Sequence, residues 1–344
     1  MKFDFIIGNP PYQEEQEGDN QNYAPPIYDK FMDATYRLAD SVELIHPARF
    51  LFNAGSTPRA WNEKMLNDPH LKVLWYEADS SQVFSNTDIK GGVAITYHDA
   101  TKNFGAIEHF IVFNELRSIA EKVSKISKES LSTIIYPAES YRFTDKMHND
   151  NPDAEALLSA GHKYDFKTSV LEKLDGSVFF QEKPDDNDNY IQVFGLIKGK
   201  RVFRWIKRKY VKSPNNLDAY KVFVPKSNGS GALGEVLSTP VIGLPVIGHT
   251  QTFMSIGRCQ TDAEAQNLLK YIKSKFCRVM LGILKITQDN PRPKWKYVPL
   301  QDFTPSSDID WSKSVVEIDR QLYAKYGLSD EEINFIESHV KEMA

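Results

Sequence analysis

Four consecutive residues near the start of the sequence, Asn9-Pro10-Pro11-Tyr12, carry groups that can hold and stack on an amino-bearing base. The Asn9 side chain offers an amide oxygen, and Pro10 keeps its backbone carbonyl although it has no N–H. Two acceptors that lie close together can hold an exocyclic amino group and stabilise the positive charge that develops when its nitrogen attacks a methyl donor. The ring of Tyr12 offers a flat face on which a base can stack. We call residues 9–12 the motif turn.

The residues that precede and form the motif turn predict where it lies. Residues 3–7 are a short, mainly apolar run with a β-branched end, which is typical of a buried strand. Gly8 releases the backbone from that strand, and Pro10 biases Asn9 away from the helical region. We therefore expect a stiff, extended turn at the carboxyl end of a strand, where open α/β sheets bind ligands. The structural alternative is a proline-rich turn that only ends a strand.

This strand and turn resemble the catalytic motif of the gamma-class N6-adenine DNA methyltransferases, which methylate amino groups. With Gly8 before it and Gln13 after it, the string is similar to the methylase part of large restriction-modification proteins. The resemblance implies that all four residues of the motif turn are catalytic. It also implies that S-adenosyl-L-methionine is the methyl donor and that double-stranded DNA is the partner, with the target base flipped out of the duplex.

The resemblance continues into two further segments. Residues 46–51 are similar to the segment that lines the target-base pocket, which assigns Arg49 and Phe50 to that pocket. Residues 91–98 resemble the strand whose end supplies an aromatic wall for the flipped base, and Tyr97 is the aromatic residue that we expect there. The alternative for Tyr97 is a tyrosine of the hydrophobic core.

The composition is that of an ordinary globular protein, with 41% hydrophobic and 26% charged residues. A chain of 344 residues is long enough for two domains. It contains no apolar run of 18 residues and no signal peptide, so we expect a cytoplasmic protein without a membrane partner. Cys259 and Cys277 alone make neither a disulfide framework nor a metal cluster, and no metal site is predicted.

Strand and helix patterns alternate through the first third of the chain. Strands are expected at 42–45, 71–76 and 91–97, and helices at 27–38 and 58–67. This alternation is typical of βαβ units. Together with the resemblance, it predicts an α/β fold, in which a partial doubly wound, Rossmann-like methyltransferase sheet precedes a mixed α+β target recognition domain and C-terminal helices.

Changes in residue composition and in the pattern of strands and turns predict three segments. These are the C-terminal half of the catalytic domain at 1–115, a DNA target recognition domain at 116–304 and a helical tail at 305–344. Residues 261–276 have the clearest helical pattern, and Thr261 with Glu264 three residues later predicts a capping box at the start of that helix.

Residues 198–212 are the most basic part of the chain, with eight lysines or arginines, no acid and interleaved aromatics. Gly199 predicts a hairpin tip between strands at 190–197 and 201–206. The cations expected to bind DNA are Lys198, Lys200, Arg201, Arg204, Lys207, Arg208 and Lys209. The alternative is an exposed hairpin with a surplus of positive charge.

A comparison of energies favours a role for this hairpin in holding DNA. Flipping a base out of a duplex costs a few kcal/mol, whereas one stacked aromatic returns roughly 1–3 kcal/mol. Phosphate contacts must therefore anchor the site. If about four cations neutralise phosphates, the logarithm of the binding constant falls with the logarithm of salt concentration at a slope near −4.

Residues 229–234 have the spacing GxGxxG, but the residues that follow do not suit a cofactor site. Such a site needs a helix next and an acid about 20 residues further on. Pro240 follows at once and residues 252–256 contain no acid, so we expect only a glycine-rich loop. The chain thus lacks the usual S-adenosylmethionine motif. We expect an N-terminally incomplete methyltransferase whose donor half is missing or is carried by a partner subunit.

A binding protein is the alternative from a different functional class. In that interpretation the chain is a catalytically inactive DNA-binding specificity subunit or remnant. Modification of RNA or of a protein glutamine would use the same turn chemistry, but the basic segment and a tail that resembles those of restriction-modification methylases favour DNA. No cluster of carboxylates with a nearby lysine can be assigned, so an endonuclease site is not predicted.

Overall fold

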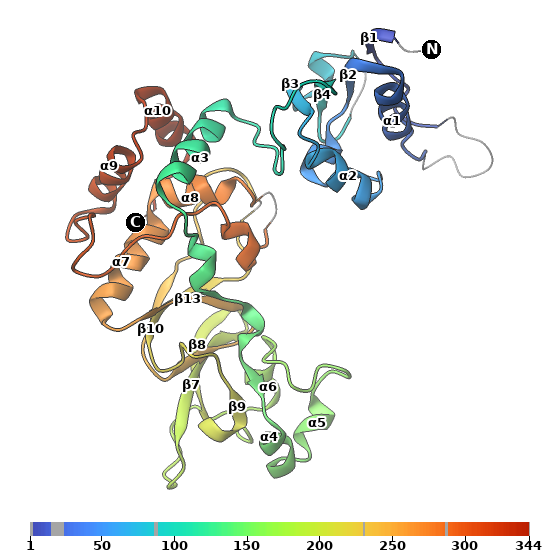
Figure 1. Ribbon diagram of the computed structural model, residues 1–344. Helices are drawn as coiled ribbons and strands as arrows, with labels where there is room; N and C mark the ends of the chain where they lie inside the picture. The colour runs from blue at the N-terminus through green and yellow to red at the C-terminus, as the bar shows by residue number, and fades with distance from the viewer. Residues whose placement is uncertain (1–2, 15–23, 86–88, 230, 286–287, 344) are drawn as a thin grey trace. The chain divides into compact units, whose positions relative to one another are not determined.

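The computed structural model describes residues 3–14, 24–85, 89–229, 231–285 and 288–343. The chain divides into two compact units, Met1–Val112 and Phe113–Ala344, which we describe one at a time (Figure 1). The three-segment division at residues 115 and 304 stays a prediction. Among the described helices, none is long and apolar enough to cross a membrane.

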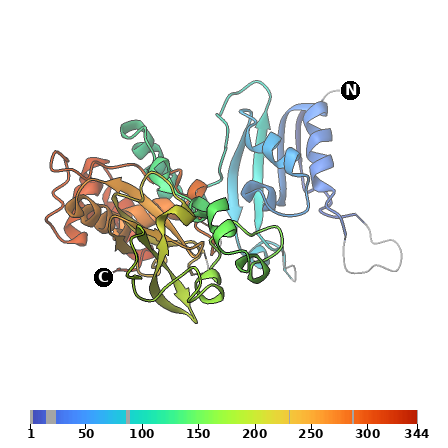
Figure 2. The ribbon, with the colours of Figure 1, turned by 90° about the horizontal axis from the view of Figure 1, so that it is seen from below.

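The first unit is built on a mixed four-stranded sheet in the order β1-β2-β4-β3. Its strands are β1 (Phe3–Gly8), β2 (Ala39–Pro47), β3 (Leu71–Glu77) and β4 (Val93–Asp99), and its helices are α1 (Tyr28–Leu38), α2 (Arg59–Leu66) and the 3-10 turns η1 (Arg49–Phe52) and η2 (Ser80–Gln82). β1 and β2 are parallel, whereas β4 is antiparallel to both β2 and β3. The expected strands and helices are present, and Figure 2 shows α1 beside the sheet. The doubly wound, Rossmann-like arrangement stays a prediction.

The core of this unit lies on one face of the sheet. Met32 of α1 and Met65 of α2 are fully buried and pack with Val42 and Leu44 of β2. Alternate residues of β2 and β4 are only partly buried, so the two faces of the sheet differ. On the edge strand β1, Phe3, Phe5 and Ile7 share the second face and are 50%, 48% and 72% exposed. An apolar face of the sheet and the outer edge of β1 are therefore accessible.

His46 is a fully buried residue of this core at the end of β2. Its Nε2 atom lies 2.8 Å from the hydroxyl of Thr96, and its ring stacks on Tyr28 with centroids 5.9 Å apart. Burial lowers the pKa of His46 to about 4, because a charged imidazolium has no water around it here.

The first unit should therefore lose stability in mild acid. A histidine with a folded pKa near 4 and an unfolded pKa of about 6.5 stabilises the fold above pH 6.5, and this contribution falls as the pH drops toward 4. At pH 5 the loss is about 2 kcal/mol. Urea unfolding of wild type and His46→Gln at pH 7.5 and pH 5 measures it. An equal difference between the two proteins at both pH values would contradict this expectation.

The second unit contains three small sheets. Their orders are β11-β10-β13-β5, β12-β7-β8 and β6-β9. The strands are β5 (Ile135–Tyr136), β6 (Arg142–Phe143), β7 (Tyr190–Ile197), β8 (Lys200–Lys207), β9 (Val211–Lys212), β10 (Tyr220–Pro225), β11 (Val241–Gly243), β12 (Ile247–His249) and β13 (Phe253–Cys259). The mixed α and β content expected for this part of the chain is present.

Helices surround and follow these sheets. They are α3 (Asn114–Ile126), α4 (Asp145–Asp150), α5 (Ala154–Leu157), α6 (Val170–Lys173), α7 (Asp262–Lys273), α8 (Lys275–Gly282), α9 (Val315–Lys325) and α10 (Asp330–His339), with 3-10 turns η3 (Leu131–Ile134), η4 (Ala138–Ser140), η5 (Arg208–Tyr210) and η6 (Arg292–Trp295). Figure 1 shows α9 and α10 near the C-terminus of the chain.

The expected hairpin is formed by β7 and β8. Lys198 and Gly199 form its two-residue tip, and both have positive φ, at 48° and 75°. A turn with two left-handed residues matches the twist of the flanking strands, which is why glycine suits this position. One face of the hairpin contributes Ile191 and Ile206 to a buried cluster, and the other places Phe194 in a second cluster.

The expected helix at 261–276 is wrong in one respect, because it breaks at Ser274. Ser274 ends α7 and caps α8, since its hydroxyl accepts a hydrogen bond from the backbone N–H of Cys277 in the first turn of α8. The hydroxyl of Thr261 caps α7 as expected. The Glu264 carboxylate, however, accepts from the N–H of Gln260 rather than from that of Thr261, so the capping box is displaced by one residue.

Candidate functional site

The motif turn follows β1 directly and leaves the sheet at the carboxyl ends of the parallel strands β1 and β2. Asn9 and Pro11 are exposed, and Pro10 and Tyr12 are partly buried. The pattern of one glycine followed by two prolines explains this geometry, because Gly8 ends the strand and neither proline can donate to a ladder. The Asn9 side chain is thus accessible to a ligand at the edge of the sheet where the parallel strands end.

Tyr12 is held in place through its backbone and its ring. Its carbonyl accepts a hydrogen bond of 3.1 Å from the N–H of Ile27, and its ring meets the edge of Phe84 at 6.2 Å. The hydroxyl oxygen is buried and makes no hydrogen bond of ordinary geometry with the described residues. Burial raises the pKa of Tyr12, and the neighbouring Asn9 side chain lowers it to a smaller extent. The phenol is therefore neutral at physiological pH.

The segment after the motif turn returns to the start of α1. Gln13 pairs with Pro26 in an antiparallel bridge, and the N–H of Glu14 donates to Pro25 over 3.0 Å. The Glu14 carboxylate also pairs with Lys30 of α1 at 2.7 Å. These contacts fix the exit of the chain from the motif turn.

Arg49 lies in η1, just after β2, and is partly exposed. Its Nε atom donates to the carbonyl of Lys90 over 2.5 Å, and a Cβ at Gly91 would lie only 2.9 Å from Arg49 Cγ. Gly91 has φ of 90°, so the close approach and the backbone conformation both require glycine. Arg49 is therefore tied to the segment between β3 and β4, which also carries Phe84.

Phe50 is placed in the core rather than at a pocket wall. Its side chain is 0% exposed, and its ring packs against those of His46 at 5.4 Å and Trp61 at 5.1 Å. A side chain with no exposed surface cannot touch a base without movement of its neighbours. Its proposed contact with the target base therefore has no support in this arrangement.

The ring contacts of Tyr97 among the described residues are with Phe5 and Phe104, so its place in the base pocket stays a prediction. Because β4 is antiparallel, its carboxyl end lies where β1 and β2 begin, and Asp99 pairs with Ser41 near the start of β2. The Tyr97 hydroxyl donates to Asp99 over 2.7 Å, and its ring stacks on Phe5 at 6.5 Å. Through Glu43 of β2, the register places Tyr97 level with Ile7, two residues before Asn9 but two strands across the sheet from β1.

Phe84 is a site residue that the sequence did not single out. It follows η2 and supplies the aromatic edge against Tyr12. Nothing in the local spacing marks Phe84, since the contact depends on how the segment between β3 and β4 folds back over the sheet. It supplies an aromatic neighbour of Tyr12 at the motif turn.

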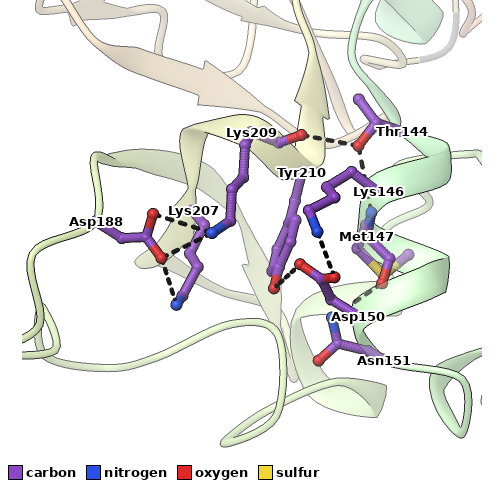
Figure 3. A network of polar contacts seen from close by, with 9 residues as sticks. All are labelled: Thr144, Lys146, Met147, Asp150, Asn151, Asp188, Lys207, Lys209 and Tyr210. Atoms are coloured by element: carbon purple, nitrogen blue, oxygen red, sulfur yellow. Dashed lines mark hydrogen bonds and ion pairs between the residues drawn. The ribbon is translucent and has the colours of Figure 1, made fainter.

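Four of the seven cations expected to bind DNA are ion-paired with aspartates of the same unit. The pairs are Arg204–Asp175 at 3.6 Å, Lys207–Asp188 at 2.6 Å, Lys209–Asp188 at 2.9 Å and Arg208–Asp218 at 2.6 Å. Figure 3 shows Asp188 accepting from both lysines. The carboxylates of Asp188 and Asp186 raise the pKa of Lys207. These pairs offset much of the positive charge that the sequence suggested.

The other three cations lie at or near the hairpin tip. Lys198 and Lys200 are exposed, and no described acidic side chain lies within ion-pairing distance of either one. Arg201 donates to the carbonyl of Thr239 over 2.8 Å and lies 5.6 Å from the ring centre of Phe253. Fewer than four hairpin cations are therefore free for phosphates, and we expect a smaller salt dependence from the hairpin than the slope of −4.

The glycine-rich stretch packs closely against neighbouring residues of the second unit. A Cβ at Gly229 would clash with the carboxylate of Glu235, which pairs with the buried ammonium of Lys285. At the other end, a Cβ at Gly234 would meet the backbone of His339 and Val340. Ser230 lies outside the described residues. The stretch thus packs against its own unit and leads to β11, not to a helix.

Comparisons with known proteins give a family match for the N-terminal part. Residues 1–84 match the Eco57I restriction-modification methylase family. A 151-residue part of the chain is 28% identical to an uncharacterized adenine-specific methylase of Mycoplasma pneumoniae. That match covers 43% of this chain and 32% of the relative, so the matched part spans about a third of that protein's length.

Two solved restriction-modification proteins align with most of the chain at low similarity. The type IIG restriction endonuclease BpuSI aligns at 10% identity and a TM-score of 0.34, over 93% of this chain and 50% of that one. The type IIL restriction-modification enzyme MmeI, in complex with DNA, aligns at 10% identity and a TM-score of 0.35, over 98% and 56%. Likeness at this level does not define the fold of this chain. Residues 1–84, which contain the motif turn, are similar to restriction-modification methylases.

Proposed function

We propose that this chain is the target-base and DNA-recognition portion of a site-specific, gamma-class adenine-N6 DNA methyltransferase. One observation carries the proposal: an exposed Asn9 stands beside a partly buried Tyr12 at the carboxyl end of β1, within the segment that matches the methylase family. The name of the Mycoplasma relative, an adenine-specific methylase, supports adenine as the base.

The chemistry of the motif turn follows from its groups. The Asn9 amide oxygen and the Pro10 carbonyl accept the two N–H groups of the adenine amino group. Both hydrogen bonds strengthen as positive charge develops on that nitrogen, so they favour the transition state over the bound base. The Tyr12 ring stacks on the base, with Phe84 packed at its edge. Arg49, tied to the same segment as Phe84, is the remaining candidate for the pocket.

We further propose that a partner polypeptide contributes the S-adenosylmethionine site, since the described residues assign no such site. S-adenosylmethionine, when bound, supplies an activated methyl group. The support is the accessible outer edge of β1 and the exposed face formed by Phe3, Phe5 and Ile7. An added strand would pair with this edge, and an added helix would cover the apolar face.

Calorimetry and methyl transfer together test these proposals. Titration of S-adenosylmethionine into this chain alone should give no binding heat. Addition of a donor-half polypeptide should restore transfer of tritiated methyl groups to duplex DNA, with N6-methyladenine as the product in nucleoside analysis. Binding of S-adenosylmethionine by the chain alone would overturn the partner proposal, and a methylated cytosine would overturn the adenine assignment.

A catalytically inactive specificity subunit is the second candidate, and the close packing of the glycine-rich stretch against its own unit supports it. It predicts sequence-selective duplex binding without any transfer in the presence of the donor half. Methylated product in the same assay would exclude it.

A further inference from the structure

A pocket of about 370 Å³ opens beside the β6–β9 pair of the second unit. Its lining combines two cations, one carboxylate, a hydroxyl and two aromatic rings. The lining residues are Arg142, Phe143, Thr144, Asp145, Tyr164 and Lys212. Neither the motif turn nor the hairpin contributes a residue to this lining.

The two cations lie directly opposite each other on an antiparallel ladder. Arg142 of β6 is the register partner of Lys212 of β9, and both side chains are exposed. Like charges at directly opposed positions repel each other and destabilise a strand pair. An anion between them would remove that cost and would be held by both groups.

The acids around this pair are already engaged. Asp165 lies 3.4 Å from Arg142, but its other oxygen pairs with His162 at 2.8 Å. The Asp145 carboxylate accepts a hydrogen bond of 2.6 Å from the hydroxyl of Tyr164. No described acidic side chain lies within ion-pairing distance of Lys212. The ammonium of Lys212 therefore lacks a partner of opposite charge in this part of the molecule.

The neighbouring lysines differ in this respect. Lys146, in the first turn of α4, pairs with Asp150 at 2.7 Å, and Lys207 and Lys209 both pair with Asp188 (Figure 3). Ion pairing within the unit thus offsets most of the local positive charge. Arg142 has one contact of this kind, at 3.4 Å to Asp165, and Lys212 has no ion pair among the described residues, so these two exposed cations are the candidates to hold an external anion.

We propose that this pocket binds a backbone phosphate of the DNA, held between the guanidinium of Arg142 and the ammonium of Lys212. The inference rests on the proposed function, which supplies DNA as the ligand. It assigns the phosphate contact to β6 and β9 and not to the ion-paired part of the hairpin. The guanidinium supplies parallel N–H donors to the phosphate oxygens, and the lysine supplies a point charge from the other side.

The test measures binding of the full chain to a mixed-sequence 24-base-pair duplex by fluorescence anisotropy over a salt series. The variants are Arg142→Gln and Lys212→Gln. Each should weaken binding at low salt and make the slope of log K against log salt less steep by about 0.9. The matched control is Lys146→Gln, an exposed lysine of the same region that is already paired with Asp150. Its slope should stay that of the wild type.

Each outcome has a distinct meaning. A slope that falls in both pocket variants and not in the control supports the phosphate site. A wild-type slope in Arg142→Gln and Lys212→Gln, with duplex binding intact, overturns the site and leaves the proposed function standing. A wild-type chain that binds no duplex at any salt concentration overturns the DNA partner itself. Thermal unfolding of each variant separates loss of binding from loss of fold.

Discussion

Replacing Asn9 with alanine should lower the rate of DNA methylation by about 10²–10³-fold in the complex with the donor half. The substitution removes one of two acceptors that stabilise charge on the amino nitrogen in the transition state. Because Asn9 is exposed and ends no hydrogen-bond ladder, the fold should not change. Single-turnover transfer of a tritiated methyl group at saturating DNA measures the chemical step directly. Duplex binding should stay close to that of the wild type.

Two Tyr12 variants provide matched controls for this experiment. Tyr12→Phe should retain most of the wild-type rate, because the hydroxyl has no hydrogen bond of ordinary geometry to lose. Tyr12→Ala removes the stacking face and should cost roughly 1–3 kcal/mol, or about 5- to 150-fold. Methylation by Asn9→Ala at the wild-type rate would eliminate the catalytic assignment of the motif turn.

Replacing Phe50 with alanine should lower the free energy of unfolding of the first unit by about 3–5 kcal/mol. The ring is 0% exposed and packs against His46 and Trp61, so its removal leaves a cavity that close-packed neighbours fill only in part. Urea-dependent hydrogen exchange of the amides of β2 and β4 reports the stability of this unit separately from that of the second.

Phe5→Ala is the matched control for Phe50→Ala. Phe5 lies in the same sheet but is 48% exposed, so its loss should change the stability of the isolated chain by less than about 1 kcal/mol. A Phe50→Ala protein that keeps its stability but loses affinity for DNA with an unpaired adenine would return Phe50 to the base pocket.

The elements of the first unit could be predicted because their signals are local. β2, β3 and β4 are apolar runs of strand length, and α1 and α2 show helical spacing after Pro26 and Pro58. The β7–β8 hairpin could be placed from its Gly199 tip and the lengths of its arms. In each case the residues that define the element are neighbours in the sequence.

The relations between elements could not be predicted in the same way. The position of Tyr97 relative to Asn9 depends on how β1, β2 and β4 pair, which the residues around Tyr97 do not encode. Phe50 was assigned to a pocket because an apolar residue looks the same whether it lines a cavity or fills a core.

The charge of the basic segment shows the same limitation at longer range. Asp188 pairs with both Lys207 and Lys209 across about 20 residues of sequence and partly offsets their charge, since the hairpin brings β8 back beside the start of β7. The number of cations in the basic segment was correct, but whether they can bind phosphates depends on the acids that the fold places beside them. The position of Arg142 opposite Lys212 on the β6–β9 strand pair could likewise not be predicted from the sequence.

The accessible face of the first unit has a consequence for the cell that makes this protein. Phe3, Phe5 and Ile7 stand on an open strand edge, and such edges join to one another when nothing else occupies them. Copies of this chain made in excess over the proposed partner polypeptide would aggregate or be degraded. Matched production of the two polypeptides, from one message or in one translation cycle, would then be as important for methylation as the chemistry at Asn9.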